Sequence, residues 1–213
     1  MRSEAAGRIA AWVAGALLAA PVLAFRYPPM GDLPMHEALV ALVRRLGDAS
    51  FAPAGLYELN LGPPNQLFHL VAAALALVVP TDLACKLVVA AAVAATPVAG
   101  ARLASHLGTS AWSGLLVAPL ALGFAFRWGL VGNVVALPIL LASLPALDRY
   151  TKEPDARRAA VACLLAVLLY LAHESAIVVY AGATAILAWR LLWNGCRAYR
   201  NPSSAARVAK DAL

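Results

Sequence analysis

Residues 67–79 read LFHLVAAALALVV, an apolar segment whose single polar side chain is His69. Crossing the hydrocarbon core of a bilayer takes about 20 residues, because an α-helix rises about 1.5 Å per residue. This segment is shorter than that, and Pro64 and Pro80 close it on both sides. We therefore expect a short interfacial or re-entrant helix rather than a full crossing, with His69 buried or interfacial beside one local partner.

The composition of the whole chain indicates a membrane protein. Of its 213 residues, 62% are hydrophobic and 13% are charged, and the mean hydropathy is +0.76. A soluble domain of this size needs a polar surface that such a composition cannot supply. Strand alternation is nowhere sustained, which favours helices. We expect an all-α integral membrane protein.

Six other apolar segments supply the expected crossings. If residues 67–79 also crossed, with a cytoplasmic N-terminus, most basic residues would lie outside, against the positive-inside rule. With about six transmembrane helices, twelve of the 17 basic residues lie inside and the N-terminus is cytoplasmic. Seven crossings with an external N-terminus are the alternative. The six segments are roughly 9–25, 83–101, 111–126, 130–147, 159–172 and 175–193.

These segments form one helical membrane domain, residues 1–193, followed by a polar tail, residues 194–213, that we expect in the cytoplasm. Residues 9–25 also fit a signal peptide, but no clean cleavage site closes them, so we expect an uncleaved anchor. The net charge of +6 reports cytoplasmic loops, and no basic stripe with interleaved aromatics indicates a nucleic-acid partner. The expected partner is the lipid bilayer, and the alanine- and arginine-rich composition is typical of a bacterial cytoplasmic (inner) membrane protein.

The first outside loop, residues 26–66, contains the polar stretch GDLPMHEALV. Apolar residues then recur with a helical period, which predicts an amphipathic helix on the membrane surface. Asp32 and Glu37 fit N-capping and the helix macrodipole at the start of this helix. Capping does not require His36, which lies four residues after Asp32 and can form a carboxylate–imidazole pair or share a metal with it.

Two further outside turns carry ionisable side chains. Arg127, in the turn FRWGLVGN, suits either an interfacial anchor or a phosphate contact, because a guanidinium matches phosphate oxygens. His173 and Glu174 form either a plain polar turn or part of the same site as Asp32. An isoleucine stands four residues after His173, so the HEXXH zinc motif is absent.

The order of these features resembles the start of the GT-C fold glycosyltransferases, multi-spanning enzymes that take sugars from polyprenyl-phosphate donors. In that family an acid in the first outside loop is the catalytic base or metal-binding group, and Asp32 stands at that place. The family's Pro-Pro pair before the next membrane segment resembles Pro63 and Pro64. Two adjacent acids are typical of the family, whereas Leu33 follows Asp32 here. GT-C enzymes are usually about twice as long or more, so the resemblance implies the core module alone: a fragment, a truncated gene, an inactive relative, or a relative that a partner subunit completes.

The resemblance implies inverting transfer of a sugar at the outer membrane face, by a transferase of the glycosyltransferase class. Asp32, helped by His36, would deprotonate the acceptor hydroxyl. Arg127, or Arg44 and Arg45 on the surface helix, would hold the departing polyprenyl phosphate.

The expected substrate-binding residues are Glu37, Arg127, His173 and Glu174. The sequence indicates no certain cofactor; a divalent cation that bridges Asp32 and the phosphate stays open, although no full ligand set points to it. Two other functions stay open. One is a non-catalytic membrane subunit or assembly protein whose polar residues are caps and anchors. The other is a small transporter, which the absence of charged residues in the middle of the apolar segments disfavours.

Overall fold

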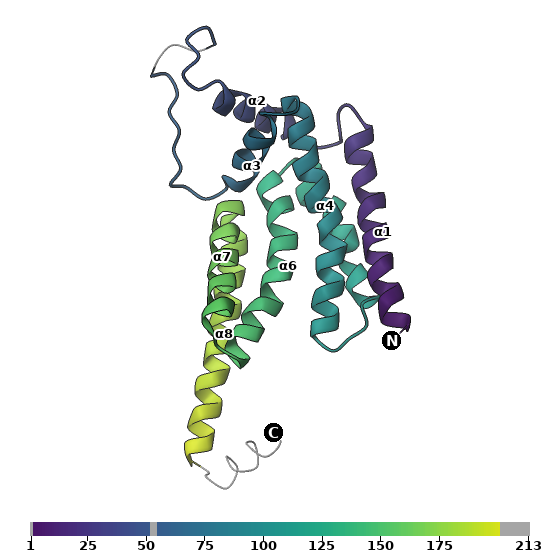
Figure 1. Ribbon diagram of the computed structural model, residues 1–213, viewed down its shortest axis with the longest axis vertical. Coiled ribbons are helices and arrows are strands. Elements are labelled where there is room, and N and C mark those ends of the chain that lie inside the picture. The colour runs from purple at the N-terminus through teal and green to yellow at the C-terminus, as the bar shows by residue number, and fades with distance from the viewer. Residues whose placement is uncertain (1, 52–54, 201–213) are drawn as a thin grey trace.

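The computed structural model describes residues 2–51 and 55–200, and every regular element within these ranges is a helix (Figure 1). The elements form a bundle of long helices with two short helices packed across one end. In chain order they are α1 (Arg2–Ala24), α2 (Leu33–Arg44), α3 (Leu67–Leu75), α4 (Thr81–His106), the 3-10 helix η1 (Ser113–Leu122), α5 (Phe124–Trp128), α6 (Val131–Lys152), α7 (Ala156–Ala172) and α8 (Glu174–Arg200).

Helix α4 is the central helix of the bundle, and it contacts α1, α2, α3, α6 and η1. Small residues let the backbones approach closely, as is typical of helix contacts in membranes. A Cβ on Gly15 of α1 would overlap the carbonyl oxygen of Ala94 in α4. Gly100 and Gly114 provide the same freedom between α4 and η1. Alanine and glycine in these helices therefore set their packing distance.

Four helices in the described ranges are long and apolar enough to cross a membrane: Ser3–Ala24, Thr81–His106, Val131–Lys152 and Glu174–Asn194. The protein is thus all-α with several helices suited to a bilayer. The segments expected to cross at 111–126 and 159–172 form shorter elements, namely η1 with α5 and the 17-residue α7. Length and composition therefore identify four candidate crossings in the described ranges, and the expected count of about six is not confirmed.

The short apolar segment forms α3, which has only nine residues and ends at Leu75. Its length is about 14 Å at 1.5 Å per residue, well short of a bilayer. The helix expected in the first loop is α2, which buries Leu33 and Val40 and packs against α3 and α4. Both short helices lie together at one end of the bundle (Figure 1).

We call the end with α2, α3, α5 and the first residues of α4, α6 and α8 the loop end. The opposite end, where α1 begins and α4 and α6 finish, is the N-terminal end (Figure 1). Helix α8 continues to Arg200, past the expected domain boundary at residue 193. The remainder of the expected tail, residues 201–213, lies outside the described residues.

Substitution of Gly15 by alanine tests the packing of α1 on α4. The added methyl group has no space beside the Ala94 carbonyl, so we expect destabilisation by about 1–3 kcal/mol, the usual cost of overpacking. Gly182 in α8 is the matched control, because a Cβ there meets open space. Gly182→Ala should be neutral or stabilising by about 0.5–1 kcal/mol. Thermal unfolding of the purified protein in detergent measures both, and equal midpoints for the two variants would contradict this packing.

Candidate functional site

A backbone contact at the loop end joins the first loop to the turn after α5. The amide of Gly31 donates to the carbonyl of Arg127 at 3.0 Å, and the amide of Asp32 donates to the carbonyl of Trp128 at 3.2 Å. Gly129 makes this approach possible, since its φ is +77° and a Cβ would lie 2.5 Å from the Asp32 amide nitrogen. Two segments almost 100 residues apart in the chain are thus held edge to edge.

The carboxylate of Asp32 takes no part in holding this contact. Asp32 is the N-cap residue of α2, but its side chain makes no capping hydrogen bond, and the residue is exposed. Its backbone carbonyl accepts from the amide of His36 at 3.2 Å. The capping interpretation therefore does not explain the side chain, which remains open to solvent and acts electrostatically on His36.

His36 has a partner that lies far away in the sequence. Its Nδ1 lies 3.0 Å from Nε2 of His69 in α3, and both rings contact Phe68 edge to face. Partial burial lowers the pKa of each imidazole, and the Asp32 carboxylate opposes this effect at His36. The local partner expected for His69 is thus replaced by a long-range histidine pair.

Glu37 faces a different set of charges from those around His36. Burial raises the pKa of its carboxyl group, Asp82 adds to the increase, and Lys86 opposes it. Asp82 and Lys86 belong to the first turns of α4. Glu37 is therefore oriented toward the start of α4, whereas Asp32 and His36 adjoin the turn after α5.

His173 and Glu174 lie in a second polar group at the same end. The side-chain amide of Asn65 donates to Oε2 of Glu174 at 3.2 Å, and that of Asn133 donates to the hydroxyl of Ser175 at 3.4 Å. Nδ1 of His173 accepts from the backbone amide of Ser175 at 3.1 Å and lies 2.8 Å from its hydroxyl. His173 thereby caps the start of α8, which is the structural role that the turn interpretation expects.

Asn65 connects the two polar groups. It has a φ of +67°, a conformation that asparagine tolerates better than most residues, and it stands one helical turn before His69. The buried amide oxygens Oδ1 of Asn65 and Oε1 of Gln66 accept no hydrogen bond from the described residues. Gly132 leaves room here, because a Cβ would lie 2.7 Å from the Ala172 carbonyl oxygen.

The loop-end cluster, as we call these residues, comprises Asp32, His36, Asn65, Gln66, His69, Asn133, His173, Glu174 and Ser175. Four predicted site residues belong to it, namely Asp32, His36, His173 and Glu174. The sequence does not single out Asn65, Gln66 or Ser175, whereas Asn133 stands within the turn FRWGLVGN that it does single out. Only the positions of these residues in the sequence point to the site, because each lies within two residues of a turn already singled out. Gln, Asn and Ser are too common in turns to mark a site by type.

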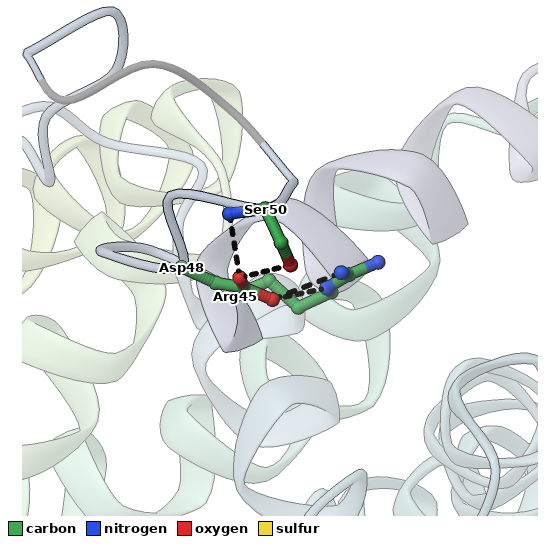
Figure 2. Close-up of polar contacts among 3 residues, drawn as sticks. All are labelled: Arg45, Asp48 and Ser50. Atoms are coloured by element: carbon green, nitrogen blue, oxygen red, sulfur yellow. Dashed lines mark hydrogen bonds and ion pairs between the residues drawn. The ribbon is translucent and has the colours of Figure 1, made fainter.

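The arginines expected to hold phosphate fall into two classes. Arg45 is engaged, since it donates to Oδ2 of Asp48 at 2.9 and 3.1 Å (Figure 2). Its guanidinium also stacks on Phe51. Ser50 also donates to Asp48, and these hydrogen bonds lower the pKa of that carboxyl group to about 2. Arg127 is exposed, and its backbone carbonyl, rather than its guanidinium, holds the first loop through Gly31.

The described residues hold no group of three or more His, Cys, Asp or Glu side chains arranged to bind a metal ion. The nitrogen atoms that face each other in His36 and His69 contact one another directly. His36 and His69 accordingly form a polar pair, and the free carboxylate of Asp32 lies beside it. These three side chains are not arranged as a set of metal ligands.

Comparison of the chain with protein-family models, with curated proteins and with solved structures gives no match. The resemblance to GT-C enzymes therefore rests on the residues and motifs quoted from the sequence. The chemistry that the chain can perform has to be inferred from the geometry of the loop-end cluster.

Replacing Gly129 by alanine tests the contact between the two loops. The left-handed backbone alone costs an L-residue about 1–2 kcal/mol, and overlap with Asp32 adds to that cost. Gly108→Ala is the control, because Gly108 has a φ of +76° and nothing within 4 Å of its Cβ position. We expect Gly129→Ala to lower the unfolding midpoint clearly more than Gly108→Ala does. Equal losses would show that no close contact exists at Gly129.

The histidine pair predicts a pH-dependent stability. Because the pKa of each imidazole is lower in the folded protein, the unfolded chain binds protons first, and stability falls as the pH drops below about 6.5. Above that pH both imidazoles are neutral in the folded and the unfolded protein, and the histidine pair no longer lowers the stability. Thermal unfolding between pH 5 and pH 8 should show this decline in the wild type and a smaller one in His36→Gln/His69→Gln. An unchanged slope in the double variant would refute the assignment.

Proposed function

We propose that the chain is the core module of a GT-C-like glycosyltransferase that moves a sugar from a polyprenyl-phosphate donor to an acceptor hydroxyl. The observation that carries the proposal is the free carboxylate of Asp32. It lies beside His36, at the junction of the first loop with the turn after α5. An exposed acid that is held by its backbone, but not consumed by a cap or an ion pair, is available for proton transfer.

The proposed reaction is a single displacement. The acceptor oxygen forms a bond to the anomeric carbon while the bond from that carbon to the phosphate oxygen breaks. The polyprenyl phosphate leaves with the electron pair, and the acceptor proton moves to the Asp32 carboxylate. His36 acts as a positioning residue, because its electrostatic interaction with Asp32 and its contact with His69 fix the imidazole beside the carboxylate.

The residues around Asp32 offer suitable binding groups. The exposed guanidinium of Arg127 matches the departing phosphate, whereas Arg45 is neutralised by Asp48 and is left out of this role. Glu174 is exposed, and its carboxylate is an acceptor for a sugar hydroxyl group.

The proposal includes the orientation of the chain in a bacterial cytoplasmic membrane. The N-terminus would be cytoplasmic and the loop end would lie at the outer face. In this proposal α7 and the η1–α5 segment also cross, which brings the number of crossings from four to six. The ten-residue 3-10 helix rises about 2.0 Å per residue, so it reaches about 20 Å before α5 adds its own length. Helix α7 spans about 25 Å at 1.5 Å per residue, close to the hydrocarbon thickness.

A non-catalytic membrane subunit is the second candidate, and the capping contact of His173 favours it. A cluster built only from caps and loop-joining hydrogen bonds would use its polar groups for structure. The two candidates differ at Asp32, whose side chain performs no such structural task.

Asp32→Asn tests the proposed function directly. Loss of a general base lowers the rate by about 10²–10⁴-fold, so we expect transfer from a tritiated polyprenyl-phosphate sugar to become undetectable. The assay uses vesicles containing the full chain, a panel of hexose and pentose donors, and release of polyprenyl phosphate as a second readout.

Asp48→Asn is the matched control, because Asp48 lies in the same loop but is bound to Arg45 and Ser50 (Figure 2). It should keep its transfer activity while the loop loses stability. Equal activity of Asp32→Asn and the wild type, or no transfer by the wild type with any donor, would contradict the proposed transfer and leave the non-catalytic subunit and the small transporter as candidates.

A further inference from the structure

A cavity of about 700 Å³ opens at the N-terminal end of the bundle, between α1, α4 and α6. It lies at the opposite end from the loop-end cluster, since it is lined by the first turns of α1 and the last turns of α4 and α6. The proposed sugar transfer uses none of its lining residues. A ligand in this cavity is therefore independent of that reaction.

Each of the three helices contributes one arginine to the cavity: Arg8 from α1, Arg102 from α4 and Arg149 from α6. A cation near the end of α4 or α6 is favoured by the helix macrodipole, but Arg8 stands near the start of α1, where no such attraction exists. Three guanidinium groups that converge from separate helices make a concentrated positive site.

The acids near this cavity have other partners. Glu4 accepts from the amide of Ala111 at 3.1 Å and from the hydroxyl of Ser105 at 3.3 Å. Asp148 lies 2.7 Å from both His106 and Lys152. Among the described residues, no acid forms an ion pair with Arg8, Arg102 or Arg149. Arg8 interacts with Glu4 only through longer-range electrostatics.

The rest of the cavity wall is mostly apolar, with Ser105 and His106 as its other polar side chains. Trp12 projects from α1 with 58% of its surface exposed, as is common for tryptophan at a membrane interface. Small side chains on α4 and α6 leave the space between the helices unfilled. The cavity therefore combines a positive rim with an apolar wall along helices suited to a bilayer; the apolar lining residues are Ala11, Trp12, Val98, Ala101, Ala142, Pro145 and Ala146.

We propose that this cavity binds an anionic phospholipid. Its phosphate lies among Arg8, Arg102 and Arg149, and one acyl chain follows the apolar wall beside Trp12. Guanidinium groups bind phosphate oxygens in pairs of hydrogen bonds, and a lipid at the membrane surface reaches the site from the bilayer without passing through water. A free phosphate ion would use the rim and leave the wall empty.

The test compares lipid binding by the full chain in detergent, using native mass spectrometry with dioleoylphosphatidylglycerol and dioleoylphosphatidylcholine. We expect phosphatidylglycerol to bind more tightly. Arg102→Gln and Arg149→Gln should each weaken its binding about fivefold, which corresponds to about 1 kcal/mol for one basic residue near an anionic lipid. Arg157→Gln is the control, because Arg157 is exposed at the same end but does not line the cavity.

Ala146→Phe tests the apolar wall without changing charge. It should weaken binding of phosphatidylglycerol, whereas Ala185→Phe on the exposed face of α8 should not. Inorganic phosphate serves as the competitor. Equal binding of the two lipids, or an equal loss in Arg157→Gln, would overturn the proposal. The proposal would also be overturned if an equal concentration of phosphate displaced phosphatidylglycerol and Ala146→Phe had no effect. Those two results together would mean that the cavity binds anions without using its apolar wall.

Discussion

Close backbone packing along α4 is the constraint on which the rest of the structure depends. Gly15, Gly100 and Gly114 let α1 and η1 reach the backbone of α4 where any side chain would overlap. In a bilayer, lipid tails are as apolar as leucine, so helices gain little by burying hydrophobic surface against one another. Close van der Waals contact between small residues supplies that missing attraction, and it fixes where each helix ends.

The positions of the helix ends explain why polar groups gather at the loop end. Once α1, α4 and α6 are packed, the first loop and the turn after α5 must meet, and Gly129 allows their backbones to pair. Short connections leave few places for Asn65, Asn133 and Glu174 except next to one another. The loop-end cluster is therefore a consequence of the bundle, and within it the carboxylate of Asp32 makes no capping hydrogen bond.

The two ends of the bundle differ in charge and shape. The loop end carries carboxylates, imidazoles and amides on short helices that lie across the bundle (Figure 1). The N-terminal end carries arginines around a cavity between long helices. An end rich in arginine suits contact with anionic lipid headgroups, which attract basic side chains.

Composition, segment length and periodicity were enough to predict an all-helical chain with several helices suited to a bilayer, a helix from Leu33 and a short helix within residues 67–79. These features follow from local periodicity and from the thickness of a bilayer, both of which one segment reveals by itself. Only the tertiary structure decides that His36 contacts His69 and that Glu37 faces the start of α4. Such contacts join residues whose separation in the chain carries no periodic signal, so only the packed helices bring them close together.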